Sequence, residues 1–179
     1  MGADEDRADV ARVLEGNPLA FEGIVRRWQG PIVNLAFRFC NDRGRAEEMA
    51  QEVFVRAWRG LATWRKEGAF STWLFALATN VYRTELRRIP VRNVPLEEAR
   101  GLRMAHDKST KLAEAQRDEI VRKSVATLPE KYRDVMVVFY FRDQDVSETA
   151  LTLSLPEGTI KARLARGRDL LRTKLERLL

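Results

Sequence analysis

The stretch DVSETALTLSLPEGTIKARLARGR, residues 145–168, carries the pattern that decides the fold. Asp145 and Glu148 have the spacing of a capping box, which predicts the start of a short helix. Residues 154–158 predict a tight turn, because they combine serine, proline and glycine. A longer helix is expected to open at Thr159 or its neighbour. Two helices joined by a tight turn, the second strongly basic, predict a helix-turn-helix.

The second of these helices has one apolar and one basic side. Ile160 and Leu164 are expected to face inward, with Ala150 as the small residue that lets the two helices approach. Residues 156–179 contain seven basic and three acidic side chains, so the basic excess of the chain concentrates here. A helix of this kind fits the major groove of DNA, where arginine and lysine bind phosphates and pair with guanine. The alternative from the pattern alone is a solvated basic helix in an ordinary bundle.

The clearest amphipathic helix lies earlier, over residues 46–61. Its apolar residues follow helical spacing and form one continuous stripe: Ala46, Met49, Ala50, Val53, Phe54, Ala57, Trp58 and Leu61. Core packing is therefore the prediction for Trp58, whereas Trp64 and Trp73 could be buried or could stack on bases. The opposite face of this helix is charged and free for a partner.

Further helices are expected on both sides of this stripe. Residues 20–28 predict one helix, Gly30-Pro31 predicts a break, and Pro31 opens a second helix that ends near Cys40. Ser71 is a plausible N-cap for a helix that reaches Arg88. No convincing period-two alternation is found, so the fold class is expected to be all-α.

A polar segment of mixed charge, residues 90–111, separates these helices from the helix-turn-helix. It lacks steady periodicity and exceeds the length of a normal loop, which favours a flexible linker between two small helical domains. The second domain then starts with a helix from about residue 112 to Leu128, followed by another that begins at Pro129.

The composition of the 179 residues excludes several classes of function. Cys40 and His106 are the only cysteine and histidine, so a His/Cys zinc site, an internal disulfide and a histidine-dependent catalytic site are not expected. We expect no cofactor, no metal and no catalytic residues. No apolar run is long enough to span a membrane, and the acidic N-terminus is not a secretory signal, so a cytoplasmic location is expected. A net charge of +6 suggests a polyanionic partner.

Several segments in register resemble the extracytoplasmic-function sigma factors, a group of the sigma-70 family. The resemblance to the promoter-reading domain rests on LPEKYR at 128–133, ETA at 148–150 and LPEGTIKARLARGR at 155–168. AEEMAQEVFVRAW, residues 46–58, is similar to the polymerase-binding helix of that family. FSTWLFALATN, residues 70–80, is similar to its promoter-melting segment. The match covers about residues 18–89 and 112–179, in family order.

The resemblance implies an all-α protein of two helical domains joined by a flexible linker. Residues 1–89 would bind core RNA polymerase and open the −10 element, residues 90–111 would be the linker, and residues 112–179 would read the −35 element as duplex. The sigma factor itself would do no chemistry. Its partners would be the clamp helices of the largest polymerase subunit, promoter DNA in duplex and single-stranded form, and an anti-sigma factor.

The resemblance also implies site residues, which we name by their numbers in this chain. The polymerase contact would use Glu48, Gln51, Glu52, Val55 and Arg56. The −10 contact would use Lys66, Phe70, Ser71, Asn80, Arg83 and Arg87. The −35 contact would use Thr159, Lys161, Ala162, Arg163, Arg166 and Arg168.

The chain departs from the family pattern at three positions in the second domain. Thr149 stands where a larger aliphatic residue is usual, Ser154 replaces the common turn glycine, and Gly167 replaces a usual alanine. A glycine inside a helix costs about 1 kcal/mol of helix propensity. These changes are expected to lower the stability of the second domain without removing its basic face.

Three other functions are weighed against this one. A sigma-mimic that binds a regulatory protein should lack the basic reading face, which is present here. A helix-turn-helix transcriptional regulator explains the second domain but not the first. An enzyme finds no support in paired carboxylates or in a glycine-rich phosphate loop.

Overall fold

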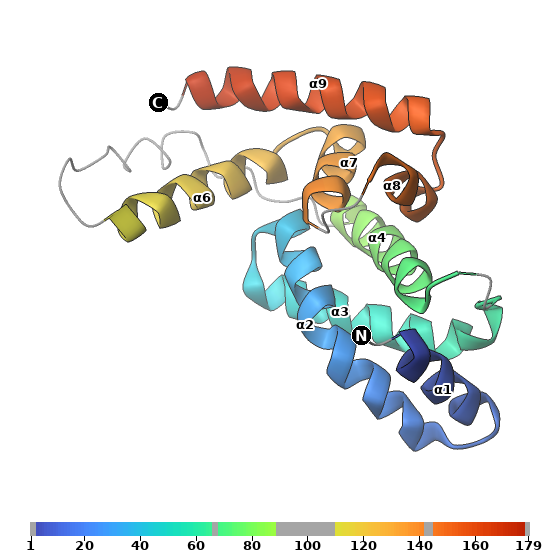
Figure 1. The fold of residues 1–179 in the computed structure, drawn as a ribbon. Helices are drawn as coiled ribbons and strands as arrows, with labels where there is room; N and C mark the ends of the chain where they lie inside the picture. The colour runs from blue at the N-terminus through green and yellow to red at the C-terminus, as the bar shows by residue number, and fades with distance from the viewer. Residues whose placement is uncertain (1–2, 66–67, 89–109, 142–144, 178–179) are drawn as a thin grey trace.

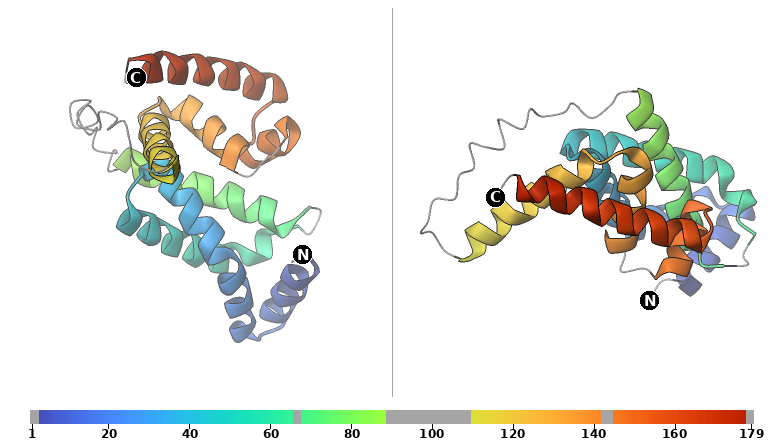
Figure 2. Two further views of the ribbon diagram at one scale, coloured as in Figure 1. Left: turned by 60° about the vertical axis from the view of Figure 1, so that its left-hand side comes forward. Right: turned by 90° about the horizontal axis from the view of Figure 1, so that it is seen from above.

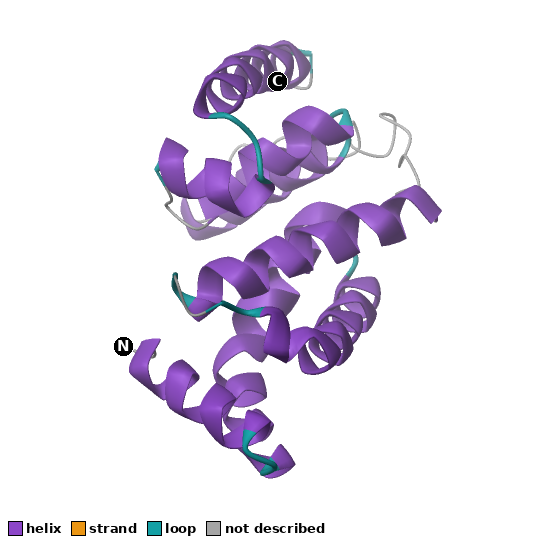
Figure 3. Cartoon of the chain, turned by 90° about the vertical axis from the view of Figure 1, so that its right-hand side faces the viewer, coloured by secondary structure: helices purple, strands orange, loops and turns teal. Residues whose placement is uncertain are grey.

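Helices form all the regular secondary structure in the parts of the chain that the computed structural model describes (Figures 1 and 3). Those parts are residues 3–65, 68–88, 110–141 and 145–177. The expected all-α class is confirmed for them. Most of the expected linker, residues 90–109, lies outside the described residues, as does Lys66.

The first domain consists of four α-helices and two short 3-10 turns. The helices are α1 (Ala3–Leu14), α2 (Phe21–Cys40), α3 (Arg43–Gly60) and α4 (Phe70–Arg88), and the turns are η1 (Pro18–Ala20) and η2 (Leu61–Thr63). Their apolar faces share one core, in which the largest fully buried side chains are Tyr82, Phe39, Phe70, Ile24, Ile32, Leu35, Leu61 and Leu74. Helix α1 is tied to α2 by ion pairs between Arg27 and two buried or nearly buried carboxylates, Asp6 and Asp9.

The predicted break at Gly30-Pro31 is wrong. Helix α2 runs without interruption from Phe21 to Cys40, with Pro31 inside it. A proline inside a helix removes one backbone hydrogen bond and costs about 3 kcal/mol. Ile24 and Ile32, on either side of Gly30, are both fully buried in the same core. Burying each such side chain contributes about 1.5–3 kcal/mol, so tertiary packing offsets the cost of Pro31.

Two helices start two or three residues earlier than expected. Asn41 ends α2 in a left-handed conformation, and the Asp42 side chain caps α3 by accepting from the Arg45 amide at 2.9 Å. Helix α4 begins at Phe70, so Ser71 lies in its first turn and is not its N-cap. The predicted end of this helix, Arg88, is confirmed.

The second domain consists of α6 (Thr110–Ala126), α7 (Glu130–Phe141), α8 (Val146–Leu153) and α9 (Glu157–Glu176). Helix α6 begins two residues before the predicted start, inside the segment expected to be linker. Asp145 caps α8, as predicted, by accepting from the Glu148 amide at 2.8 Å. A smaller core joins these helices and includes Leu128, Val135, Met136, Val138, Leu153, Ile160 and Leu164.

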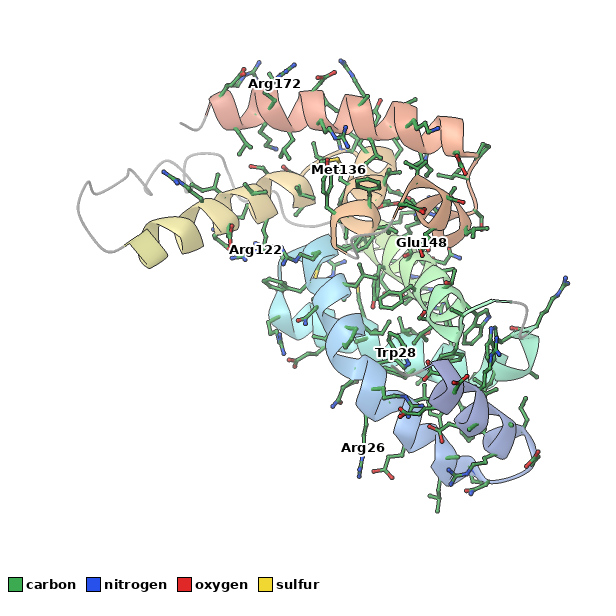
Figure 4. All side chains as sticks on the ribbon, in the orientation of Figure 1. Arg26, Trp28, Arg122, Met136, Glu148 and Arg172 are labelled. Atoms are coloured by element: carbon green, nitrogen blue, oxygen red, sulfur yellow. The ribbon has the colours of Figure 1, made fainter. Side chains whose placement is uncertain are left out.

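The turn between α8 and α9 is shorter than predicted. Ser154 closes α8 with φ 52°, a left-handed conformation that glycine adopts at no steric cost. Helix α9 then begins at Glu157, two residues before Thr159. Farther along α9, Gly167 is buried, and a Cβ there would lie only 3.0 Å from the Met136 side chain. The absence of a side chain at Gly167 lets α9 pack closely on α7, where Figure 4 shows Met136.

The two domains pack against each other. Helix α8 lies beside α4, and α6 and α7 contact α2 (Figures 1 and 2). Val137 of α7 is 5% exposed and belongs to the core of the first domain. Helix α9 forms the outermost layer, on the side of the second domain that faces away from the first (Figure 1).

Candidate nucleic-acid and polymerase interfaces

Helix α9 presents a basic surface to solvent. Ile160, Leu164 and Gly167 form its buried side, as the sequence predicts for the two aliphatic residues. The residues expected at the −35 element are exposed or half-buried: Lys161, Ala162, Arg166 and Arg168 are exposed, and Thr159 and Arg163 are half-buried. All six side chains thus lie outside the core of the second domain.

These six residues do not all lie together on α9. Lys161 and Arg163 are two positions apart, which places them about 200° apart around the helix axis. Arg168 shares the flank of Lys161 and faces α7, where its Nε donates to the Tyr140 hydroxyl at 2.7 Å. Arg168 is therefore held beside the second domain's own surface, whereas Arg163 and Arg166 lie on the other flank.

Helix α3 presents a second exposed face, on the first domain. Glu48, Gln51 and Val55 are exposed, and Glu52 and Arg56 are half-buried. Arg56 Nε lies 2.6 Å from Glu52 Oε1, so these two side chains form an ion pair along the helix. The residues fall at spacings of three and four and share one side of α3. The face expected to bind polymerase is accessible, and the second domain does not contact α3 closely.

Trp58 extends that exposed face, contrary to the prediction that it packs in the core. Its side chain is 42% exposed, and its ring meets the edge of Phe21 with centroids 5.1 Å apart. Val55 beside it is 43% exposed. The apolar stripe of α3 is wider than the neighbouring helices can cover, so its last turns leave large apolar side chains in solvent. Exposed aromatic residues of this kind are enriched where proteins bind partners.

The residues expected at the −10 element are divided between surface and core. Asn80 is exposed and Ser71 is half-buried on α4. Phe70 is only 1% exposed and packs between Trp64 and Trp73, with ring centroids 5.2 Å and 5.4 Å away. The structure thus assigns Phe70 to the core under this surface. Trp64, whose role was open, is also buried.

Arg83 and Arg87 point from α4 toward the second domain. Arg83 Nε lies 2.5 Å from Asp134, and Arg87 makes two hydrogen bonds to Glu130, at 2.7 Å and 3.1 Å. These hydrogen bonds lower the pKa of Glu130 below its ordinary value. The sequence analysis did not predict these ion pairs. One signal for them exists in the sequence, because Arg83 and Arg87 are four residues apart and so are Glu130 and Asp134.

A large groove lies on the second domain beside α2. Its volume is about 870 Å³, and α6, α7 and α9 supply most of its walls. Val121, Val125 and Leu171 line it with apolar surface, and its arginines are Arg38, Arg122, Arg168 and Arg172. The sequence pattern did not predict this groove, because its walls come from four separate helices.

The described residues offer no group of three or more histidine, cysteine and acidic side chains that could hold a metal ion. Cys40 is 3% exposed, and burial raises the pKa of its thiol, which donates to the Asp42 carbonyl. His106 lies outside the described residues. Within the part of the chain that was searched, no helix is long and apolar enough to cross a membrane.

Comparisons with known proteins match both domains. The family Sigma-70 region 2 matches residues 24–89, and the family Sigma-70, region 4 matches residues 118–171. The RNA polymerase sigma-H factor of Pseudomonas aeruginosa is 32% identical, over 98% of this chain and 96% of that protein. The ECF RNA polymerase sigma factor SigW of Bacillus subtilis is 30% identical, over 94% and 96%.

Solved structures share the arrangement of helices. CnrH in complex with the cytosolic domain of CnrY matches with a TM-score of 0.68 and 25% identity, over 96% of this chain and 97% of that one. The sigma factor RpoE of Bartonella quintana, solved with the anti-sigma factor NepR, has the same fold with a TM-score of 0.63 and 18% identity, over 87% and 96%. Because both domains are matched in order and the two relatives, covered almost in full, are 32% and 30% identical, the chain belongs to the extracytoplasmic-function group of the sigma-70 family and is an alternative sigma factor that directs transcription initiation.

Proposed function

We propose that this sigma factor docks on core RNA polymerase through the exposed face of α3. The observation that carries the proposal is that Glu48, Gln51 and Val55 are exposed on a helix whose other side is fixed in the core. A rigid helix with acidic, apolar and basic side chains in sequence along one face orients a partner of complementary charge. We add Trp58 to this contact, because a half-exposed indole supplies a large apolar anchor.

The −35 element is read by α9 in the major groove. The first turns of a reading helix reach base edges, and those turns carry Thr159, Lys161, Ala162 and Arg163. Arginine pairs with the O6 and N7 atoms of guanine, while lysine binds phosphates as a point charge. The position of α9 in the outermost layer leaves room for a duplex.

The −10 element is held as single strand beside α4. Asn80 is exposed and can both donate to and accept from a base edge. Lys66 and Ser71 lie before and in the first turn of the same helix, and Arg83 and Arg87 add positive charge farther along it. A strand captured in this way needs cations along its backbone and polar side chains at its bases.

The chain itself carries out no catalysis in this scheme, and it acts in the cytoplasm, where core polymerase and promoter DNA are found. We also propose that an anti-sigma factor controls it, because the structurally similar RpoE of Bartonella quintana is found in complex with the anti-sigma factor NepR. The arginine-lined apolar groove beside α9 suits an amphipathic helix with acidic residues.

A double variant tests the polymerase contact. Gln51→Ala with Glu52→Arg changes two residues that lie off the buried stripe and places a like charge beside Arg56. Binding to core polymerase should weaken at least about tenfold, a change of about 1.4 kcal/mol. Helicity by circular dichroism and binding to a −35 duplex should stay at the wild-type level.

A matched control uses the same kind of exposed ion pair on α2. Glu22→Arg places a like charge beside Arg26, whose present distance to Glu22 is 2.6 Å. Both side chains are well exposed, and Figure 4 shows Arg26 at the end of the first domain that is far from the second. The control should bind core normally. If the α3 variant stays helical and binds core as tightly as the control, the face does not dock polymerase.

A further inference from the structure

The groove bounded by α6, α7 and α9 has the size and the lining of a small-molecule site. Its volume of about 870 Å³ lies within the range of about 300–1,000 Å³ that such sites occupy. Pockets of this kind are mostly apolar and carry a few polar groups that orient the ligand. The groove fits that description, because its interior is aliphatic and its charged residues are the four arginines named above and one acid, Glu176. The charged lining therefore adds up to +3 among the described residues.

The aliphatic residues of the groove form two rows above a buried floor. Val121 and Val125 are four positions apart on α6, so they share one side of that helix. Leu171 and Leu175 have the same spacing on α9. The floor is Met136 and Val137 of α7, each 5% exposed. Two parallel rows of branched side chains suit an unbranched alkyl tail, because apolar burial is non-directional and scales with the area removed from water.

The arginines border this apolar surface. Arg168, Arg172 and Leu175 lie within about 60° of one another around the axis of α9, so the two guanidinium groups flank the leucine row. Arg168 Nε donates to the Tyr140 hydroxyl at 2.7 Å. Arg172 donates to Asp169 at 3.1 Å. A guanidinium carries five N–H donors, more than these bonds use, and its planar fork matches a carboxylate.

We propose that the groove binds one long-chain fatty acid, with the alkyl tail along the valine and leucine rows and the carboxylate at the arginines. This ligand goes beyond the function proposed above. Charge complementarity selects an anion, and the volume selects a small one. A helix 10 Å across and three turns long occupies about 1,270 Å³, so an acidic helix of an anti-sigma factor would enter the groove only in part. Such a helix and the fatty acid would compete for the same arginines.

Titration calorimetry of the full chain with decanoate and laurate, below the concentrations at which they form micelles, tests the proposal. We expect one saturable site. A fully buried methylene group tightens binding by about fourfold, so laurate, with two more methylenes, should bind at least about fourfold more tightly than decanoate. Decyltrimethylammonium has a ten-carbon tail and a cationic head, and it should bind at least about tenfold more weakly than decanoate.

Removal of two arginines tests the contact with the carboxylate. Arg122 and Arg172 come from α6 and α9 (Figure 4), and each pairs with an acid on its own helix. Arg122→Gln with Arg172→Gln should weaken laurate binding at least about tenfold, the effect of one lost hydrogen bond to a charged group. Circular dichroism should show that the variant keeps its helices.

A matched control removes the same charge from the first domain. Arg26 and Arg43 are exposed, and each pairs with a glutamate on its own helix. Arg26→Gln with Arg43→Gln should bind laurate as wild type does. Equal weakening by the two double variants would show that laurate responds only to net charge, and it would overturn the proposal.

The apolar wall is tested separately, in a variant that keeps every arginine. Val121 is 40% exposed, so Val121→Gln replaces a wall residue without opening the core. It should weaken laurate binding more than decanoate binding. In amide spectra of the wild type, laurate should shift the signals of Val125 and Leu171 and leave that of Ile24, in the core of the first domain, unchanged.

Four results overturn the proposal: no saturable binding of laurate, equal affinity for decanoate and decyltrimethylammonium, no effect of Val121→Gln, or shifts spread over both domains. Each of them leaves docking through α3, reading by α9 and control by an anti-sigma factor intact, since none of these requires a fatty acid.

Discussion

Single alanine variants on α9 separate base reading from phosphate binding. Lys161 is exposed, and its ammonium lies 3.9 Å from Glu157, in a pair whose side chains are both more than half exposed. Such a pair contributes less than about 1 kcal/mol and leaves the lysine available to a phosphate. Arg163 and Arg166 lie on the other flank of the exposed face. We therefore expect substitutions on the two flanks to affect DNA binding in different ways.

Lys161→Ala should weaken binding to all duplexes alike and reduce the slope of log K against log salt by about 0.9, the effect of one lost phosphate contact. Arg163→Ala or Arg166→Ala should cost about 1–3 kcal/mol where the residue reads a base, a loss of about 5- to 150-fold. That loss should fall on the cognate −35 sequence and should leave binding to unrelated duplexes nearly unchanged.

Fluorescence anisotropy with cognate and scrambled −35 duplexes, at several salt concentrations, measures both effects. Arg26→Ala is the matched control, because it removes an exposed arginine from the first domain. The reasoning is refuted if Lys161, Arg163 and Arg166 can each be replaced with no change in affinity or in salt slope.

Three further predictions concern stability and reactivity. Asp145→Ala removes the cap on the Glu148 amide and should destabilise the second domain by about 0.5–2 kcal/mol in thermal unfolding. An unchanged unfolding temperature would contradict the role of the cap. Ser154→Gly relieves a left-handed conformation and should stabilise the same domain by up to about 1 kcal/mol in urea, whereas destabilisation would show that its hydroxyl matters more. Cys40, whose thiol pKa is raised by burial, should resist iodoacetamide in the native protein and react fully in urea; equal rates would place it at the surface.

The features that the sequence predicted well are local ones. The stripe of α3 follows from helical spacing, and Ala46, Val53 and Ala57 are fully buried as expected. The cap at Asp145 depends on residues three apart, so its geometry is set by the sequence alone. The basic face of α9 likewise follows from the positions of its own residues.

The features that the sequence could not predict depend on packing between distant segments. Pro31 is tolerated inside α2 because helices from elsewhere bury both halves. Trp58 is exposed because the neighbouring elements that the structure describes cover only part of the last turns of α3. Arg83 and Arg87 meet carboxylates more than 40 positions away, and no local pattern predicts that α7 lies against α4. The sequence analysis assigned Gly167 only a cost in helix propensity. It could not predict the compensating contact, in which the lack of a side chain at Gly167 lets Met136 of α7 pack closely against α9.

The measurement that tests the central claim most directly is run-off transcription with purified core polymerase on a template that carries a cognate promoter. We predict a transcript of defined length that appears only when this chain is added, and that is lost with the Gln51→Ala, Glu52→Arg variant but retained with Glu22→Arg. Transcription that is independent of the chain, or a transcript that both variants support equally, would contradict the claim that α3 joins this protein to polymerase at the promoter.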